Sequence, residues 1–126
     1  MLRMKKHYLL GPKYATLSPE AVQAALGLVG FTATRVSEVR LWGTGNLAFA
    51  LYYQPERAPL FVDLTELTPD RDEAMSAWEM AEELTKDPII LDQVRCLIEV
   101  RHYEDADPTA VEAVLAFLRA DNGVAA

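Results

Sequence analysis

The stretch Leu47-Ala48-Phe49-Ala50-Leu51-Tyr52-Tyr53 contains no charged residue and is largely apolar. Successive side chains of a strand point to opposite faces of its sheet. One face would therefore carry Leu47, Phe49, Leu51 and Tyr53, and the other Ala48, Ala50 and Tyr52. A strand that is apolar on both faces is typical of the centre of a sheet covered on both sides. We therefore expect residues 47–53 to form a central strand.

Residues on either side of this stretch show the alternation of half-buried strands. Before it, Val36, Glu38, Arg40 and Trp42 alternate with Ser37, Val39 and Leu41. After it, Leu60, Val62 and Leu64 alternate with Phe61, Asp63 and Thr65. A predicted turn at residues 43–46 and a loop at residues 54–59, which contains two prolines, make the connections. The pattern predicts that residues 31–65 form a meander of three neighbouring strands.

Three residue pairs predict helix starts: Ser18-Pro19, Thr68-Pro69 and Asp107-Pro108. In each, a polar N-cap precedes a proline, whose fixed φ suits the first helical turn. The first predicted helix runs from residue 19 to a C-terminal cap at Gly30, the second from residue 69 to about residue 86, and the last from residue 108 to residues 122–123.

Between the second and last helices, residues 89–91 predict a short strand, residues 92–93 a tight turn and residues 94–103 a long strand. The predicted fold class is α+β, an antiparallel sheet with helices packed on it in the order α-βββ-α-ββ-α. We divide the chain into an N-terminal arm or short strand at residues 1–17, a single α+β domain at residues 18–122, and a loose C-terminus at residues 123–126.

The composition narrows the classes of function. A chain of 126 residues is long enough for one self-sufficient core. Its formal charge of −7 disfavours binding to nucleic acid, although Arg3, Lys5, Lys6, His7 and Lys13 form a local basic cluster. The single cysteine, Cys96, excludes an intramolecular disulfide. We find no signal peptide and no apolar run long enough to span a bilayer, so we expect a soluble, cytoplasmic protein.

No motif in the sequence identifies a catalytic residue. The pair Gly43-x-Gly45 precedes a predicted strand, whereas a phosphate-binding loop needs a following helix. Cys96 and His102 lie six residues apart on one predicted strand, which separates their backbones by about 20 Å. We therefore expect a non-enzymatic protein without a cofactor.

Acidic residues near the last helix suggest a metal site only weakly. The cluster consists of His102, Glu104, Asp105 and Asp107. Asp107 precedes Pro108, where a carboxylate caps a helix and complements its dipole. We favour this structural role and expect no metal.

Two groups of residues are candidates for protein interfaces. By alternation, some aromatic residues of the predicted strands must lie on the sheet face that no helix covers, where they could bind a partner protein. The candidate partner-binding residues are Trp42, Tyr52, Tyr53, Phe61 and Tyr103. The second predicted helix has one large apolar side chain, Trp78, among small residues, and this face could pack on the sheet or on a second copy of the chain. The candidate dimer-interface residues are Met75, Trp78, Ala81 and Leu97.

Three segments carry a resemblance to known families. They are residues 18–31, a capped helix ending in Leu-Val-Gly-Phe; residues 59–64, a Pro-Leu-Phe-Val-Asp-Leu strand before a long helix; and residues 89–118, paired strands, an acidic turn and a closing helix. With the block order of residues 18–121, they resemble the YbjN-like family of sensory-transduction regulators and the type III secretion chaperones. The resemblance implies a homodimeric, non-enzymatic adaptor or chaperone-like module that holds an extended segment or tail of another protein.

A second resemblance stays open. With residues 5–10 as a strand, the chain partly resembles a ferredoxin-like, small-molecule-sensing regulatory domain, and residues 21–43 are similar to nitrogen-regulatory signal proteins. The strand at residues 60–65 would then be surplus to that fold, and the nucleotide-binding loop would be missing.

Overall fold

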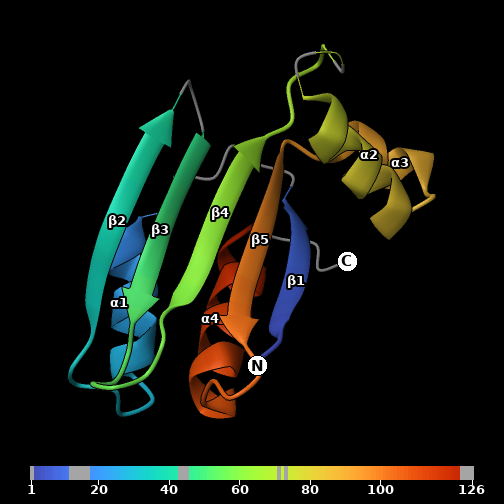
Figure 1. Ribbon diagram of the computed structural model, residues 1–126. Coiled ribbons are helices and arrows are strands. Elements are labelled where there is room, and N and C mark those ends of the chain that lie inside the picture. Colours follow the sequence, from blue (N-terminus) through green and yellow to red (C-terminus); the bar gives the residue numbers. More distant parts are fainter. Residues whose placement is uncertain (1, 12–17, 43–45, 71, 73, 123–126) are drawn as a thin grey trace.

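The structure is a computed structural model that describes residues 2–11, 18–42, 46–70, 72 and 74–122, except for the side chains of Trp42, Asp121 and Asn122. Within these residues, five strands form one antiparallel sheet in the order β1-β5-β4-β3-β2 (Figure 1). The strands are β1 (Met4–Gly11), β2 (Arg35–Trp42), β3 (Asn46–Tyr52), β4 (Leu60–Glu66) and β5 (Cys96–Tyr103). The helices are α1 (Pro19–Gly27), α2 (Met75–Leu84), α3 (Pro88–Gln93) and α4 (Pro108–Asn122). The α+β prediction is confirmed.

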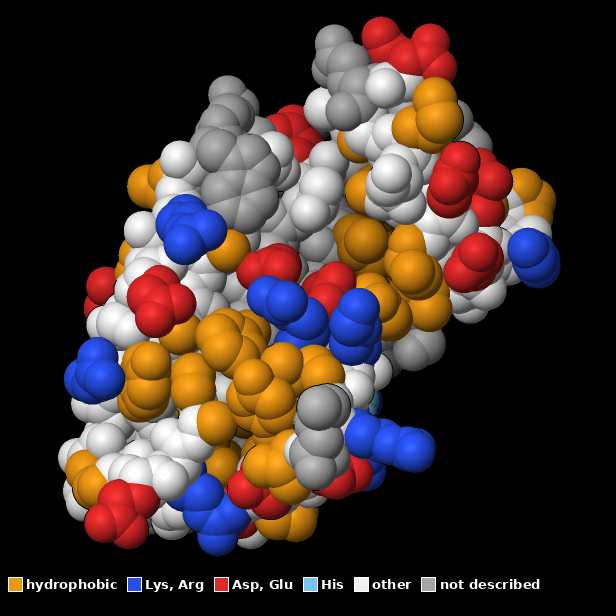
Figure 2. Space-filling model, in the orientation of Figure 1, with side chains coloured by type: hydrophobic (Ala, Val, Ile, Leu, Met, Phe, Trp, Pro, Cys, Tyr) orange, Lys and Arg blue, Asp and Glu red, His pale blue; other side chains and the backbone are white. Residues whose placement is uncertain are grey.

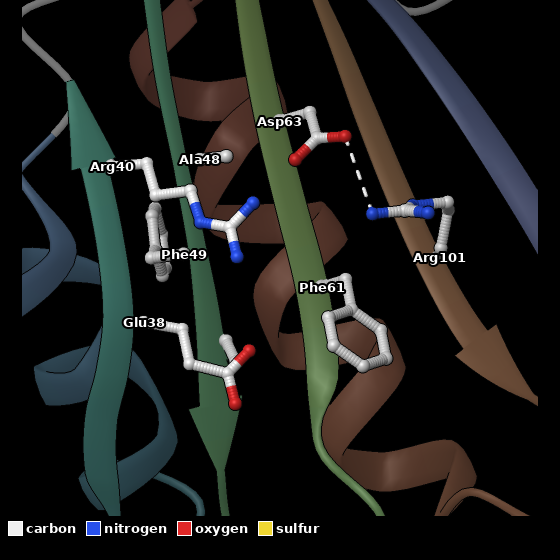
Figure 3. A pocket seen from close by; sticks show the side chains of 8 residues that line it. Glu38, Arg40, Ala48, Phe49, Phe61, Asp63 and Arg101 are labelled. Carbon is white, nitrogen blue, oxygen red and sulfur yellow. Dashed lines mark ion pairs between the residues drawn. The ribbon is translucent and has the colours of Figure 1, made fainter. Parts of the chain in front are cut away.

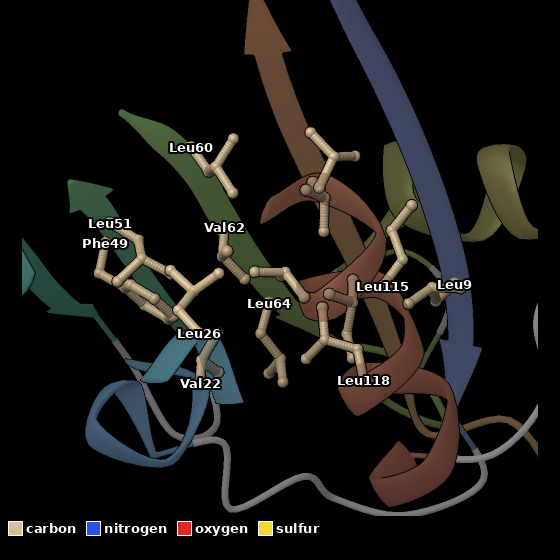
Figure 4. Packing of buried hydrophobic residues seen from close by; sticks show 14 of the residues in the cluster. Leu9, Val22, Leu26, Phe49, Leu51, Leu60, Val62, Leu64, Leu115 and Leu118 are labelled. Atoms are coloured by element: carbon tan, nitrogen blue, oxygen red, sulfur yellow. The ribbon is translucent and has the colours of Figure 1, made fainter. Parts of the chain in front are cut away.

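The predicted meander is present. Strands β2, β3 and β4 are consecutive neighbours, and β3 lies inside the sheet between the other two. Helices α1 and α4 pack behind the sheet in the view of Figure 1 and cover one of its faces. The main core lies between them and the sheet, where side chains from β3 and β4 meet Leu26 of α1 and Leu115 and Leu118 of α4 (Figure 4).

A second, smaller core lies at one end of the opposite face. Helices α2 and α3 sit beside the ends of β4, β5 and β1 (Figure 1). The buried members of this second core are Leu10, Leu67, Trp78, Ala81, Val94 and Leu97. Leu10 and Leu97 are register partners on β1 and β5, so this core covers only that end of the sheet face.

The N-terminal segment is a full member of the sheet. Strand β1 pairs with β5 along its whole length, from Met4 opposite Tyr103 to Gly11 opposite Cys96. Leu9 and Leu10 anchor it, because Leu9 is buried in the main core and Leu10 in the second core. Of the two predicted alternatives for this segment, the short strand is correct.

The predicted strand at residues 89–91 and turn at residues 92–93 are wrong, because these residues form α3. Asp87 is the N-cap of this helix, and its Oδ1 accepts a hydrogen bond from the Ile89 backbone N–H at 2.9 Å. Pro88 occupies the first helical turn. The helix start therefore has the same Asp-Pro chemistry as residues 107–108, and it overrides the β preference of the Ile-Ile pair.

The second helix begins later than predicted, at Met75 rather than Pro69. The Thr68 hydroxyl donates a hydrogen bond to the Asp70 backbone oxygen at 2.8 Å instead of accepting one from a helical N–H. Ser18 behaves as predicted, because its side chain accepts a bond from the Ala21 N–H at 3.4 Å. Of the predicted turn at residues 43–46, residues 43–45 lie outside the described residues, and Asn46 is the first residue of β3.

A bulge in β2 changes the predicted alternation. The register between β2 and β3 shifts between Ser37 and Arg40, and Glu38 has a positive φ of 57°. Ser37 pairs with Ala50 and Arg40 with Ala48, so both β2 residues lie on the same face although three positions separate them. Strict alternation had placed Arg40 on the face opposite Ser37.

Candidate binding face of the sheet

Among the described residues, helices cover the sheet face opposite α1 and α4 only at the end beside α2 and α3 (Figure 1). Register partners define the side chains of this open face: Arg35, Ser37 and Arg40 on β2, Ala48, Ala50 and Tyr52 on β3, Phe61, Asp63 and Thr65 on β4, Glu99, Arg101 and Tyr103 on β5, and Lys6 and Tyr8 on β1. Figure 2 shows apolar side chains gathered over the lower centre of this face and beside α2 and α3, with a band of charged side chains between them.

Arg101 organises the charged band. Its guanidinium lies 3.3 Å from the Asp63 carboxylate and 3.4 Å from the Glu99 carboxylate. It also lies over the Phe61 ring, 5.3 Å from the ring centroid. Burial and then the Glu99 charge raise the pKa of Tyr8, the register partner of Glu99, so its hydroxyl remains protonated at neutral pH.

A hollow of about 270 Å³ opens over the middle of β3 (Figure 3). Ala48 and Ala50 form part of its floor, and Arg40 of β2 and Phe61 of β4 stand on opposite sides. We call it the alanine hollow. Neighbouring strands lie about 4.8 Å apart, so the flanking strands are separated by roughly 10 Å, which is the width of one extended chain with its side chains.

The charges around the alanine hollow are only partly paired. Asp63 faces Arg101, whereas the Arg40 guanidinium extends across β3 into the hollow (Figure 3). Among the described residues, no acidic side chain forms an ion pair with Arg40. Glu38, displaced by the bulge, also lines the hollow. A ligand in the hollow would therefore meet a cation that has no acidic partner in the described part of the chain.

A second hollow, of about 380 Å³, lies at Tyr52 and the loop at residues 54–57. The guanidinium of Arg35 lies over the Tyr52 ring at 4.0 Å from its centroid, on one wall of this hollow. Tyr52 follows Ala50 on the same face of β3. The two hollows thus line the same side of β2 and β3 in succession.

The five predicted partner-binding aromatics divide between the two faces. Tyr52, Phe61 and Tyr103 are half-buried on the open face. The side chain of Trp42 lies outside the described part of the structure. Tyr53 is 1% exposed and belongs to the main core, so its prediction as a binding residue is wrong.

Tyr53 directly follows β3 and continues its alternation, and this gives the side chain a structural role. It shares the covered face with Leu47, Phe49 and Leu51, and its ring packs edge-on against Phe31. Its hydroxyl accepts a hydrogen bond from the Asp107 N–H at 2.9 Å. It therefore ties the end of β3 to the start of α4.

The predicted dimer-interface residues are mostly internal. Trp78, Ala81 and Leu97 are buried in the second core, and the indole N–H of Trp78 donates to the Thr68 backbone oxygen at 2.8 Å. Of the two alternatives for this helix face, packing on the sheet is correct for these three residues. Met75, at 56% exposed, is the only one of the four that is exposed.

Cys96 and Asp107, which the sequence offers as catalytic or metal-binding candidates, both occupy structural positions. Cys96 is buried on β5, with its Sγ 3.8 Å from the Gly11 oxygen. Asp107 caps α4 by accepting a hydrogen bond from the Thr109 N–H at 2.9 Å. Within the described ranges, no three histidine, cysteine or acidic side chains form a group able to hold a metal ion. The Gly43-x-Gly45 pair and Lys13 lie outside those ranges.

The sequence did not point to the alanine hollow. The pattern predicts Ala48 and Ala50 only as part of an apolar strand, although two small residues in succession on one face of a central strand indicate a depression. Arg40 could not be assigned to this face without the bulge.

Comparison of the chain with models of known families, with curated proteins and with solved structures finds no match. In the part of the chain that the structure describes, no helix combines the length and apolar character needed to cross a membrane.

Proposed function

We propose that the protein is a non-enzymatic adaptor or chaperone-like module that holds an extended segment of a partner protein against the open face of its sheet. The observation that carries the proposal is the alanine hollow together with the second hollow beside Tyr52. The proposal assigns no catalytic residue, metal or cofactor to this face.

The shape of the face favours an extended chain. From Ala48 to Tyr52 the floor follows four residue steps of β3, about 14 Å, which is the length of roughly four residues of an extended segment. Side chains of β2 and β4 stand along both sides. The alanine hollow, at about 270 Å³, lies slightly below the usual size of small-molecule pockets and suits one or two side chains of a bound segment.

The chemistry of the walls also favours a protein ligand. Tyrosine and arginine are enriched among the residues that dominate protein interfaces. Arg40 and Phe61 line the alanine hollow and Tyr52 lines the second hollow; Tyr52 and Phe61 are half-buried, and Arg40 is exposed. We expect the bound segment to place an apolar side chain over Ala48 and Ala50 and a carboxylate against Arg40.

Homodimer formation belongs to the same proposal. The second core leaves Met75 as the candidate residue through which α2 would contact another copy. Light scattering at micromolar concentration should give twice the chain mass of 14.0 kDa. A mass of one chain would remove the dimer from the proposal without affecting the binding face.

Selection of a random dodecapeptide library on the purified protein tests the binding function. Affinities of selected peptides would be measured by fluorescence anisotropy for the parent chain, Phe61→Thr and a matched control, Leu28→Thr. Leu28 is exposed and follows α1, on the other side of the sheet. Loss of one interface aromatic typically costs more than 1 kcal/mol, so we expect about tenfold weaker binding for Phe61→Thr and no change for the control.

Two outcomes would contradict the proposal. One is that the library yields no peptide that binds the parent chain. The other is that the selected peptides bind Phe61→Thr as tightly as the parent chain.

A further inference from the structure

The chain has two histidines, and the fold brings them together. His7 on β1 and His102 on β5 are separated by 95 positions, yet their Nε2 atoms lie 2.9 Å apart. Both point to the helix-covered face, beside α4. His102 is 6% exposed and is the buried polar residue of the described core.

The two rings meet edge to edge. Their planes lie within 15° of parallel, and their centroids are 5.0 Å apart. The centroid separation exceeds the Nε2–Nε2 distance by about two ring radii, so the nitrogens point at one another instead of one ring covering the other. This is the geometry of an N–H···N hydrogen bond, with one proton between the rings.

A backbone carbonyl fixes which ring donates. The Nδ1 atom of His102 lies 2.8 Å from the Tyr103 oxygen. A carbonyl can only accept, so Nδ1 of His102 carries a proton, and in the neutral ring its Nε2 is then the acceptor. His7 must therefore donate through Nε2, which leaves its Nδ1 as the remaining basic nitrogen of the pair.

The pair can take one extra proton without breaking, but not two. The first would bind Nδ1 of His7 and leave the N–H···N contact intact. The second would have to bind Nε2 of His102, where it would set two N–H groups and two positive charges against each other.

The surrounding charges act on the same equilibrium. Burial, and then the neighbouring His102, lower the pKa of His7. Glu112 on α4 opposes this, whereas Arg119 on α4 and Lys5 on β1 reinforce it. Glu104, in the turn after β5, lines the same hollow of about 210 Å³ as both histidines. Charged neighbours therefore both raise and lower the pKa of His7, and the hydrogen bond between the two rings remains the direct contact of the pair.

We infer that the two histidines form a proton-controlled latch that holds the N-terminal half of β1, residues 4–7, against β5. The latch is closed while one proton is shared between the Nε2 atoms and opens when both rings are charged. Opening stops short of Leu9, because Leu9 and Leu10 are buried in separate cores, whereas Met4, Lys5 and Lys6 are exposed. It frees the backbone edge of β5 at residues 101–103, which pairs with residues 4–6 in the closed state.

Nuclear magnetic resonance of the intact chain between pH 8 and pH 5 tests the latch, because only two imidazoles contribute. We expect His7 to titrate at Nδ1 below the usual histidine pKa. Amide exchange protection at residues 5–7 should fall with the second proton, while protection at residues 9–11 persists. Independent titration of both rings near pH 6.5, or unchanged protection at residues 5–7 once both rings are charged, would overturn the inference.

Denaturant unfolding of the parent chain and of the double variant His7→Gln, His102→Gln gives a second readout. The unfolded chain binds protons that the folded pair excludes, so stability is present above about pH 6.5 and is lost as the pH falls below it. For each excluded proton, the unfolding constant should rise about tenfold per pH unit. The double variant should lack this rise between pH 7 and pH 5.5, and an equal rise in both proteins would contradict the latch. If the double variant does not fold, the titration of the parent chain still decides.

Discussion

Replacement of Trp78 by alanine should strongly destabilise the domain. The side chain is 6% exposed and fills the second core between α2 and the β1–β5 end of the sheet. Truncation of a buried tryptophan costs about 3–5 kcal/mol, against a total of roughly 5–15 kcal/mol for a typical domain. Trp78→Phe should cost only about 1 kcal/mol, because it keeps an aromatic ring and loses the hydrogen bond to the Thr68 oxygen.

Urea unfolding followed by circular dichroism at two protein concentrations, tenfold apart, would measure these losses. A residue of the chain's own core gives a loss that does not depend on concentration, whereas an interface residue gives a concentration-dependent loss. Glu79→Ala is the control on the same helix, and its exposed side chain should change stability by less than about 0.5 kcal/mol. The reasoning fails if Trp78→Ala is a folded monomer with an unfolding free energy within about 1 kcal/mol of the parent chain.

Three further predictions concern single backbone or side-chain features, each measured by urea unfolding. Gly27→Ala in α1 should stabilise the protein by about 0.5–1 kcal/mol, because the site has open space for a methyl group and alanine favours the helix. Gly30→Ala has the same open space but should destabilise the protein by about 1–2 kcal/mol, because Gly30 has a φ of +97°. Equal effects of the two substitutions would contradict this reasoning. Asp87→Ala should cost about 1 kcal/mol through loss of the α3 cap, and an unchanged midpoint would argue against that cap. Tyr53→Phe should cost about 1 kcal/mol and leave peptide affinity unchanged, whereas weaker peptide binding would return Tyr53 to the binding face.

The sequence predicted the parts of the fold that depend on local pattern. Residues 47–53 and the alternating runs on either side of them define a meander without reference to any distant segment, and the structure confirms β2, β3 and β4 as neighbours. The caps at Ser18 and Asp107 likewise act within three residues of themselves. The cap at Asp87 is equally local, but the Ile-Ile-Leu run that follows it has the composition of a strand.

Features that depend on distant contacts were not predictable in this way. The outer half of β1 is exposed and polar, and its place in the sheet follows from its register with β5 almost a hundred residues later. The β2 bulge at Glu38 places Arg40 at the alanine hollow, which no alternation rule anticipates. The helical pattern around Trp78 is compatible with two kinds of packing, and its place in one core with Leu10 and Leu97 decides between them.

The footprint of a bound peptide on the amide resonances of the protein tests the central claim most directly. With a selected dodecapeptide at saturation, we expect the largest shifts at residues 48–52 of β3 and 61–63 of β4, with little change along α4. Shifts concentrated on α4, or spread evenly over the chain, would show that the open face and its alanine hollow are not the binding site.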